Sequence, residues 1–136
     1  MLGGGPAGSS AALLLASWGH AVRLITRLPA QTRLAVSLPP SCSKLFDAIG
    51  VSEAIDRAGF FRSTGNTVWW GSPDPRVEIF AGGARGWQVE THVLESVLLE
   101  QAALAGVSIE RRAITDLDCR GGSSDPPSSF VVSSHK

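Results

Sequence analysis

Three glycines near the start of the chain have the spacing of a turn that binds a dinucleotide. They are Gly3, Gly5 and Gly8, in the pattern Gly-x-Gly-x-x-Gly. In such a turn the first glycine allows a tight connection, the second lets the backbone approach a pyrophosphate, and the third lets helix and strand pack closely. The free N–H groups of the following helix attract phosphates. The spacing predicts a pyrophosphate site to which Pro6, suited to a first helical turn, and Ala7 also contribute.

Thr26 and Arg27 occupy the second position at which a dinucleotide is usually held. An acidic side chain about 20 residues beyond the glycines normally binds the ribose. This sequence reads Ile25-Thr26-Arg27 there, with no carboxylate. Thr26 can form a weaker hydrogen bond to a ribose hydroxyl. Arg27 can stack on adenine, contact a phosphate, or be a solvated surface charge. Both residues are therefore candidate nucleotide contacts.

No other spacing in the sequence indicates a catalytic or metal-binding group. His20, His92 and His135 have no serine, cysteine or carboxylate at a spacing typical of a triad or metal site. Cys42 and Cys119 lack C-x-x-C spacing, which disfavours zinc and redox sites and favours reduced thiols in the cytoplasm. We therefore assign no catalytic residue and no metal ligand.

The composition is typical of a globular domain. Apolar residues make up 43% and charged residues 18% of the 136 residues, enough for one domain with a core. Twelve basic and twelve acidic residues cancel, which argues against a nucleic acid or an anionic membrane as a partner. The longest apolar run, residues 11–18, is far shorter than the roughly 20 residues of a membrane span. The sequence indicates no oligomeric state.

The residues around the glycines predict most of a βαβ unit. Residues 9–18 have a helical composition and are followed by Gly19, whereas residues 20–25 alternate as a strand. Only Met1 and Leu2 precede the glycines, so we expect the first strand to be truncated, with Leu2 as its remnant. We also expect the place of that strand to lie between the second and third strands of the sheet.

Residues 91–105 give the strongest helix prediction in the chain. Gly106 ends this helix, and short strands are expected over residues 107–110 and 114–119. One apolar stripe along the helix predicts a face that packs on the core. The stripe consists of Leu94, Val97, Leu98, Ala102 and Ala105.

Residues 28–89 are predicted to be an insertion of short helices and antiparallel strands. Residues 28–43 are interpreted as irregular, because three prolines prevent a continuous helix. Helices are expected over residues 44–49 and 52–58, and Ser52 is the predicted cap of the second.

Strands are expected over residues 66–70 and 76–81, joined by the turn sequence Gly-Ser-Pro-Asp-Pro, and over residues 86–89. The tryptophans of this region are interpreted as core or pocket-wall residues. They are Trp69, Trp70 and Trp87.

Four blocks of the sequence, taken in order, resemble one family. They are GGGPAGSSAALLLASWGHAVRLITR, RLAVSLPPSCSKLFDAIGV, AGFFRSTGNTVWWG and GWQVETHVLESVLLEQAALAGV. These blocks are similar to the FAD-dependent oxidoreductases of the glutathione-reductase-like superfamily. The similarity is to the branch that holds flavin-dependent halogenases, aromatic-type monooxygenases and geranylgeranyl reductases. It extends over residues 2 to about 119.

The resemblance implies an α/β class: a partial Rossmann-like FAD-binding fold with a truncated first strand and an inserted α+β substrate-side segment. Residues 1–119 would be an incomplete FAD-binding domain, with residues 28–89 as the insertion. Residues 120–136 would be a Gly/Ser/Pro-rich loop and the start of a return strand. The resemblance implies FAD as cofactor, NADH or NADPH as reductant and a small organic substrate. The chain is interpreted as an N-terminal fragment that is inactive alone.

Several positions depart from the family's pattern. The acidic ribose residue is replaced by Thr26, the glutamate of a Gly-Glu-Ser segment by Val36, and the arginine after the Gly-Trp motif by Thr91. The lysine that halogenases carry before a tryptophan is missing near Trp69, whereas residues 37–41 match a loop that lies toward the flavin. Two alternatives stay open. One is a nonenzymatic remnant or interaction module without cofactor, and the other is an NAD(P)-binding module.

Overall fold

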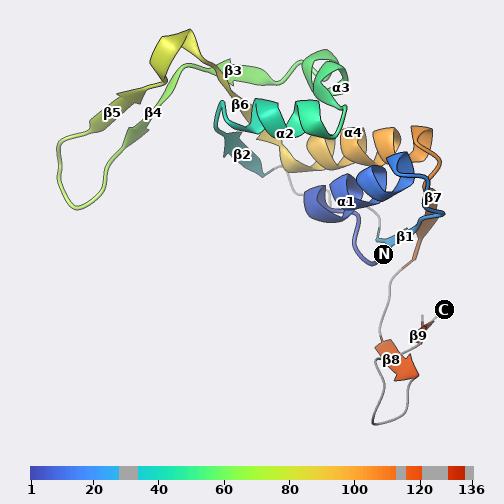
Figure 1. Ribbon diagram of the computed structural model, residues 1–136. Helices are drawn as coiled ribbons and strands as arrows, with labels where there is room; N and C mark the ends of the chain where they lie inside the picture. The colour runs from blue at the N-terminus through green and yellow to red at the C-terminus, as the bar shows by residue number, and fades with distance from the viewer. Residues whose placement is uncertain (28–33, 113–115, 121–128, 134–136) are drawn as a thin grey trace.

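A glycine turn, a helix and a strand open the fold, in the order that the sequence predicts (Figure 1). Helix α1 spans Pro6–Ser17 and strand β1 spans Arg23–Thr26. Gly19 follows the helix with φ +87°, a conformation that favours glycine, which confirms the predicted helix end. The structure is a computed structural model, and it describes residues 1–27, 34–112, 116–120 and 129–133.

Strand β1 is the middle of a small parallel arrangement. On one side it pairs in parallel with β7, Ser108–Arg111. On the other side Leu2 forms a parallel bridge to Ile25, flanked by backbone hydrogen bonds of 2.8 and 2.9 Å. Successive peptide groups of a strand point to opposite edges, so β1 bonds to both neighbours at once. The first strand, of which Leu2 is the remnant, was expected to lie between the second strand, β1, and the third strand, β7. This expectation is wrong, because β1 lies between Leu2 and β7.

Helix α4, Thr91–Leu104, packs along α1 and contributes much of the core (Figure 1). Its predicted apolar stripe is confirmed, since Leu94, Leu98 and Ala102 are buried. Leu99 is also buried, although the stripe did not include it. This side chain faces the glycine turn, with its Cδ2 3.1 Å from the position of a Cβ on Gly4.

Three strands of the insertion form an antiparallel sheet. Its order is β2, Ala35–Leu38; then β6, Gly86–Glu90; then β3, Phe61–Ser63. Strand β2 lies inside the stretch interpreted as irregular, so that interpretation is wrong for these residues. Of the three prolines that suggested irregular backbone, Pro39 and Pro40 come directly after the strand, where they do not interrupt its pairing, and Pro29 lies outside the described residues.

Two short helices connect β2 to β3. Helix α2 spans Cys42–Ala48 and helix α3 spans Ser52–Arg57, close to the predicted ranges. Ser52 is not the cap of α3, because Val51 occupies that position. The Ser52 hydroxyl instead donates to the carboxylate of Asp47, so it ties α3 to the end of α2.

The strands β4, Gly65–Val68, and β5, Arg76–Ile79, form a two-stranded ribbon that projects from the body (Figure 1). A short 3-10 turn, Ala81–Gly83, leads from β5 toward β6. The ribbon confirms the predicted hairpin. It also shows that Trp69 and Trp70 are not core residues, because they are 63% and 90% exposed, although Trp70 does line a hollow as a pocket-wall residue.

The third tryptophan, Trp87 in β6, is a core residue as predicted. It is 4% exposed. The edge of its ring packs on Phe46, with centroids 5.4 Å apart and an interplanar angle of 80°. The Arg62 guanidinium covers its face at 4.3 Å from the centroid. Trp87 therefore joins α2 to the antiparallel sheet.

Beyond β7, strands β8, Asp116–Arg120, and β9, Ser129–Ser133, pair antiparallel. The loop expected between them falls on residues 121–128, which lie outside the described residues, as does His135.

Candidate functional site

The glycine turn is a close contact between the end of the first strand and the start of α1. Gly3 has φ +95°, which favours glycine over any residue with a Cβ. A Cβ on Gly8 would overlap the carbonyl oxygen of Gly3. Ser9 reinforces the contact, because its buried hydroxyl donates to Gly4 O at 2.8 Å. The third glycine of the motif is therefore required by the backbone of the turn itself.

The N-terminus of α1 presents free hydrogen-bond donors. Gly5 is the N-cap residue and has no side chain to cap the helix, and Pro6 follows it in the first turn. Within the part of the chain that the structure describes, the N–H groups of Gly5, Ala7 and Gly8 have no acceptor. The first N–H bonded inside this helix end is that of Ser9, which donates to Gly5 O at 2.9 Å. Such a set of free donors suits a phosphate group.

The surroundings of Gly5 are open on the side where a side chain would stand. The nearest heavy atom to an ideal Cβ there is Oε1 of Glu95, at 3.8 Å. Glu95 lies on α4, one residue after the buried Leu94. Sequence reasoning did not single out this carboxylate, since only the packing of α4 along α1 brings it to the turn. Its negative charge disfavours a second anion nearby.

Thr26 closes the other side of the turn. The residue is 9% exposed, and its Oγ1 accepts a hydrogen bond of 3.0 Å from the N–H of Gly4. The same hydroxyl donates to Arg27 O at 3.1 Å. Its proton and one acceptor position are thus used within the protein. Thr26 positions the glycine turn, and one lone pair of its oxygen is left for a ligand.

A hollow of about 270 Å³ opens beside the turn, at the carboxyl ends of β1 and β7. Ligands of open α/β sheets commonly bind at this edge of the strands. The structure brings three predicted positions, Gly3, Thr26 and Arg27, together here with two of their chain neighbours and with Arg112, which was not predicted. The described lining residues are Leu2, Gly3, Ile25, Thr26, Arg27 and Arg112.

Arg112 is the cationic residue that sequence reasoning missed. It follows β7, and its N–H donates to Thr26 O at 2.9 Å, which continues the parallel pairing by one residue. Its Nε lies 3.1 Å from Oε1 of Glu110, and its side chain is 34% exposed. The signal for it was its place two residues after the strand predicted over residues 107–110, because parallel strands end at one edge of a sheet.

Thr91, like Thr26, departs from the family's pattern and has a structural role. Thr91 begins α4, where its N–H and its hydroxyl both donate to Leu34 O, at 2.9 and 2.6 Å. Val36 is exposed in β2. Next to it, the hydroxyl of Ser37 is hydrogen-bonded to the amide of Gln88 across the sheet. Thr91 and Ser37 therefore hold β2 against α4 and β6.

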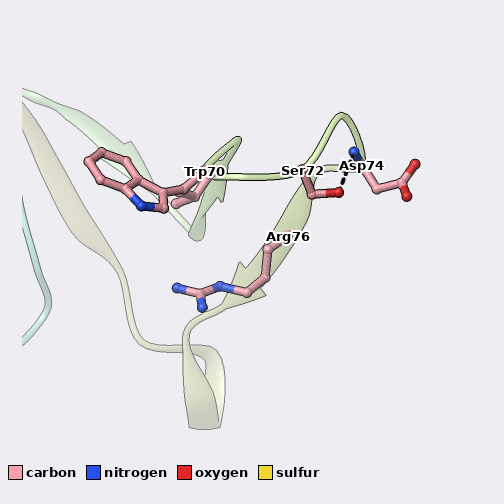
Figure 2. A pocket seen from close by; sticks show the side chains of 5 residues that line it. Trp70, Ser72, Asp74 and Arg76 are labelled. Atoms are coloured by element: carbon pink, nitrogen blue, oxygen red, sulfur yellow. Dashed lines mark hydrogen bonds between the residues drawn. The ribbon is translucent and has the colours of Figure 1, made fainter.

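A separate hollow of about 470 Å³ lies on the β4–β5 ribbon, away from the glycine turn. Figure 2 shows Ser72 and Asp74 in the turn of the ribbon, where the N–H of Asp74 donates to Ser72 Oγ at 3.1 Å. Trp70 and Arg76 line the same hollow, and Arg76 lies 3.0 Å from Glu78. Its lining contains none of the predicted nucleotide contacts.

Within the described residues, no group of three or more His, Cys, Asp or Glu residues could hold a metal ion. Likewise, none of the helices described is both long and apolar enough to cross a membrane.

The model of one known protein family, described as an FAD binding domain, matches residues 1–117. The chain belongs to the FAD binding domain family. This FAD binding domain has the parallel strands, the glycine turn and the helix N-terminus expected of a nucleotide-binding fold. The relationship to FAD-dependent halogenases and monooxygenases, predicted from the four sequence blocks, is confirmed at the level of the family.

A curated relative and two solved structures agree with this membership. The chain is 39% identical over 72 residues to a tryptophan 2-halogenase of Chondromyces crocatus, covering 52% of this chain and 14% of the relative. The myxobacterial chondrochloren halogenase CndH matches with TM-score 0.77 and 30% identity, over 88% of this chain and 30% of that one. A flavoprotein/dehydrogenase of Cytophaga hutchinsonii matches with TM-score 0.74 and 28% identity, over 88% and 31%. The chain thus spans less than a third of each of these proteins.

Proposed function

We propose that this FAD binding domain is the nucleotide-binding part of an FAD-dependent oxidoreductase of the halogenase and monooxygenase kind. The observation that carries the proposal is the set of free N–H donors at the start of α1, beside a hollow at the carboxyl ends of β1 and β7. The halogenase and dehydrogenase structures that it resembles support the same assignment.

The residues present fit the phosphate part of FAD. The N–H groups of Gly5, Ala7 and Gly8 would bind the pyrophosphate, and Gly5 leaves open space for it to approach. Arg27 and Arg112 would contact the adenosine end in the adjoining hollow. When bound, the flavin supplies the redox chemistry of such enzymes, and the protein supplies binding and orientation.

Other parts of the proposal concern the whole enzyme. We propose that the whole enzyme takes electrons from NADH or NADPH and acts on a small organic substrate. We also propose that it is located in the cytoplasm. The two isolated cysteines support the location, because they fit a reducing compartment. We further propose that residues 1–136 by themselves bind FAD weakly and do not turn over substrate. Thr26 replaces a ribose-binding carboxylate, and Glu95 puts a negative charge beside the phosphate site.

Titration of the 136-residue chain with FAD tests the proposal. Binding is measured by isothermal titration calorimetry and by flavin fluorescence. Gly5→Val is the decisive variant. Gly5 has φ −68°, and a side chain there has open space, so we expect the variant to fold and to lose FAD binding by blocking the phosphate. Ala11→Val is the matched control, because Ala11 is an exposed residue of the same helix.

Gly8→Val tests the turn in a second way. The added side chain overlaps Gly3 O, so both FAD binding and the melting temperature should fall. If wild type, Gly5→Val and Ala11→Val all bind FAD equally, the glycine turn is not the phosphate site. Absence of FAD binding in the wild type would reject the proposed function for this chain.

A further inference from the structure

The hollow at the ends of β1 and β7 has the charge of a phosphate site rather than that of a ribose-diol site. A carboxylate at this edge accepts hydrogen bonds from the ribose hydroxyls, whereas an arginine accommodates a phosphate on the ribose 2′-oxygen. None of the described residues that line this hollow carries a carboxylate. Two of them, Arg27 and Arg112, carry guanidinium groups.

Thr26 does not restore the missing carboxylate. Its Oγ1 is already the acceptor for the N–H of Gly4, at 3.0 Å, and its proton is directed to Arg27 O. A ribose diol would therefore meet one remaining lone pair of a neutral oxygen. This is a weaker acceptor than a carboxylate, which can bond to both hydroxyls of the diol.

Glu110 is the acidic residue that pairs with Arg112. It is ion-paired with Nε of Arg112 at 3.1 Å, and it does not line the hollow. Among the described residues that line the hollow, the charged side chains are therefore the two guanidinium groups. The planar, multiply donating guanidinium of Arg112 can bind a phosphate while Nε faces Glu110.

We propose that this hollow accepts a phosphate on the ribose of an adenine nucleotide, bound by Arg27 and Arg112. A dinucleotide with a 2′-phosphate on its adenosine would therefore bind at this site in competition with FAD. The inference rests on the proposed function in one respect, which is that the neighbouring glycine turn binds the 5′-phosphates.

A pair of ligands with two phosphates each tests the proposal on the 136-residue chain. Adenosine 2′,5′-bisphosphate carries the added 2′-phosphate, whereas ADP carries both phosphates at the 5′ end. By calorimetry, we expect the bisphosphate to bind about tenfold more tightly than ADP. This difference in affinity is the one expected from a single charge-assisted hydrogen bond. FAD is titrated in parallel.

Three variants assign the preference to residues. Arg112→Gln and Arg27→Gln should each weaken bisphosphate binding several-fold more than they weaken ADP binding, because both ligands share the adenosine and only the bisphosphate carries the 2′-phosphate. Arg111→Gln is the matched control, because Arg111 is an exposed arginine next to Arg112 in the sequence and is not among the described residues that line the hollow. A fall in ADP binding of the same size would instead indicate a purely structural role for the substituted arginine, and it would overturn the proposal.

The outcomes separate the two proposals. Equal affinity of wild type for the bisphosphate and ADP overturns the phosphate site, whether or not FAD binds. Preference for the bisphosphate without FAD binding supports the phosphate site and rejects the FAD function. If none of the three nucleotides binds, both proposals are wrong.

Discussion

The hydroxyl oxygen of Thr26 accepts a hydrogen bond of 3.0 Å from the N–H of Gly4, and this bond joins the end of β1 to the glycine turn. The bond is buried and links residues that are 22 positions apart in the sequence. Thr26 stands where related flavoproteins are expected to have an acidic residue. In this chain the position therefore helps to shape the turn that the nucleotide would contact.

Thr26→Val should destabilise the fold. Valine has nearly the shape of threonine but cannot accept the Gly4 N–H, and a buried unsatisfied donor costs about 1–3 kcal/mol. Urea unfolding followed by circular dichroism measures the difference. Thr67→Val is the control, because Thr67 is exposed on the β4–β5 ribbon. Equal midpoints for the two variants would show that the Gly4 N–H finds another acceptor.

Glu95→Gln should strengthen FAD binding. Oε1 of Glu95 is 3.8 Å from the Cβ position of Gly5, so its charge opposes a pyrophosphate at the turn. Removing a like charge near the surface is worth about 0.5–1 kcal/mol, or two- to fivefold in affinity. The gain should shrink in high salt, which screens the repulsion.

Glu100→Gln provides the comparison for Glu95→Gln. Glu100 is an exposed carboxylate on the same helix. Unlike Glu95, it does not lie within 4 Å of the Cβ position of Gly5. Calorimetric titration with FAD should show no change for this variant. A similar gain in both variants would mean that only net charge matters, and unchanged binding in both would remove Glu95 from the site.

Leu98→Ala should cost about 2–5 kcal/mol of unfolding free energy, because it opens a cavity in the core. Leu98 is 2% exposed and lies in the cluster that joins α4 to the sheets. Leu104→Ala, at the exposed end of the same helix, should change stability by less than about 0.5 kcal/mol. Comparable losses in both variants would contradict the placement of the core.

Local patterns predicted the elements whose signals lie within a few residues. Gly19, Gly50, Gly59 and Gly106 each follow a predicted helix and each has positive φ. The stripe on α4 and the hairpin of β4 and β5 were predicted for the same reason, since spacing and turn composition are properties of adjacent residues. Strand β2 was missed because its pairing partner, β6, is distant in the sequence.

The sequence by itself determined the glycine spacing, the helix that follows it and the candidate positions Thr26 and Arg27. Only the tertiary structure decided that Thr26 bonds to Gly4, that Arg112 joins Arg27 at one edge of the sheet, and that Glu95 lies near Gly5. It also decided that β1 is the central strand. The physical reason is that strand pairing and helix packing bring together residues that are distant in the sequence. A local sequence pattern does not specify which distant residues will be in contact.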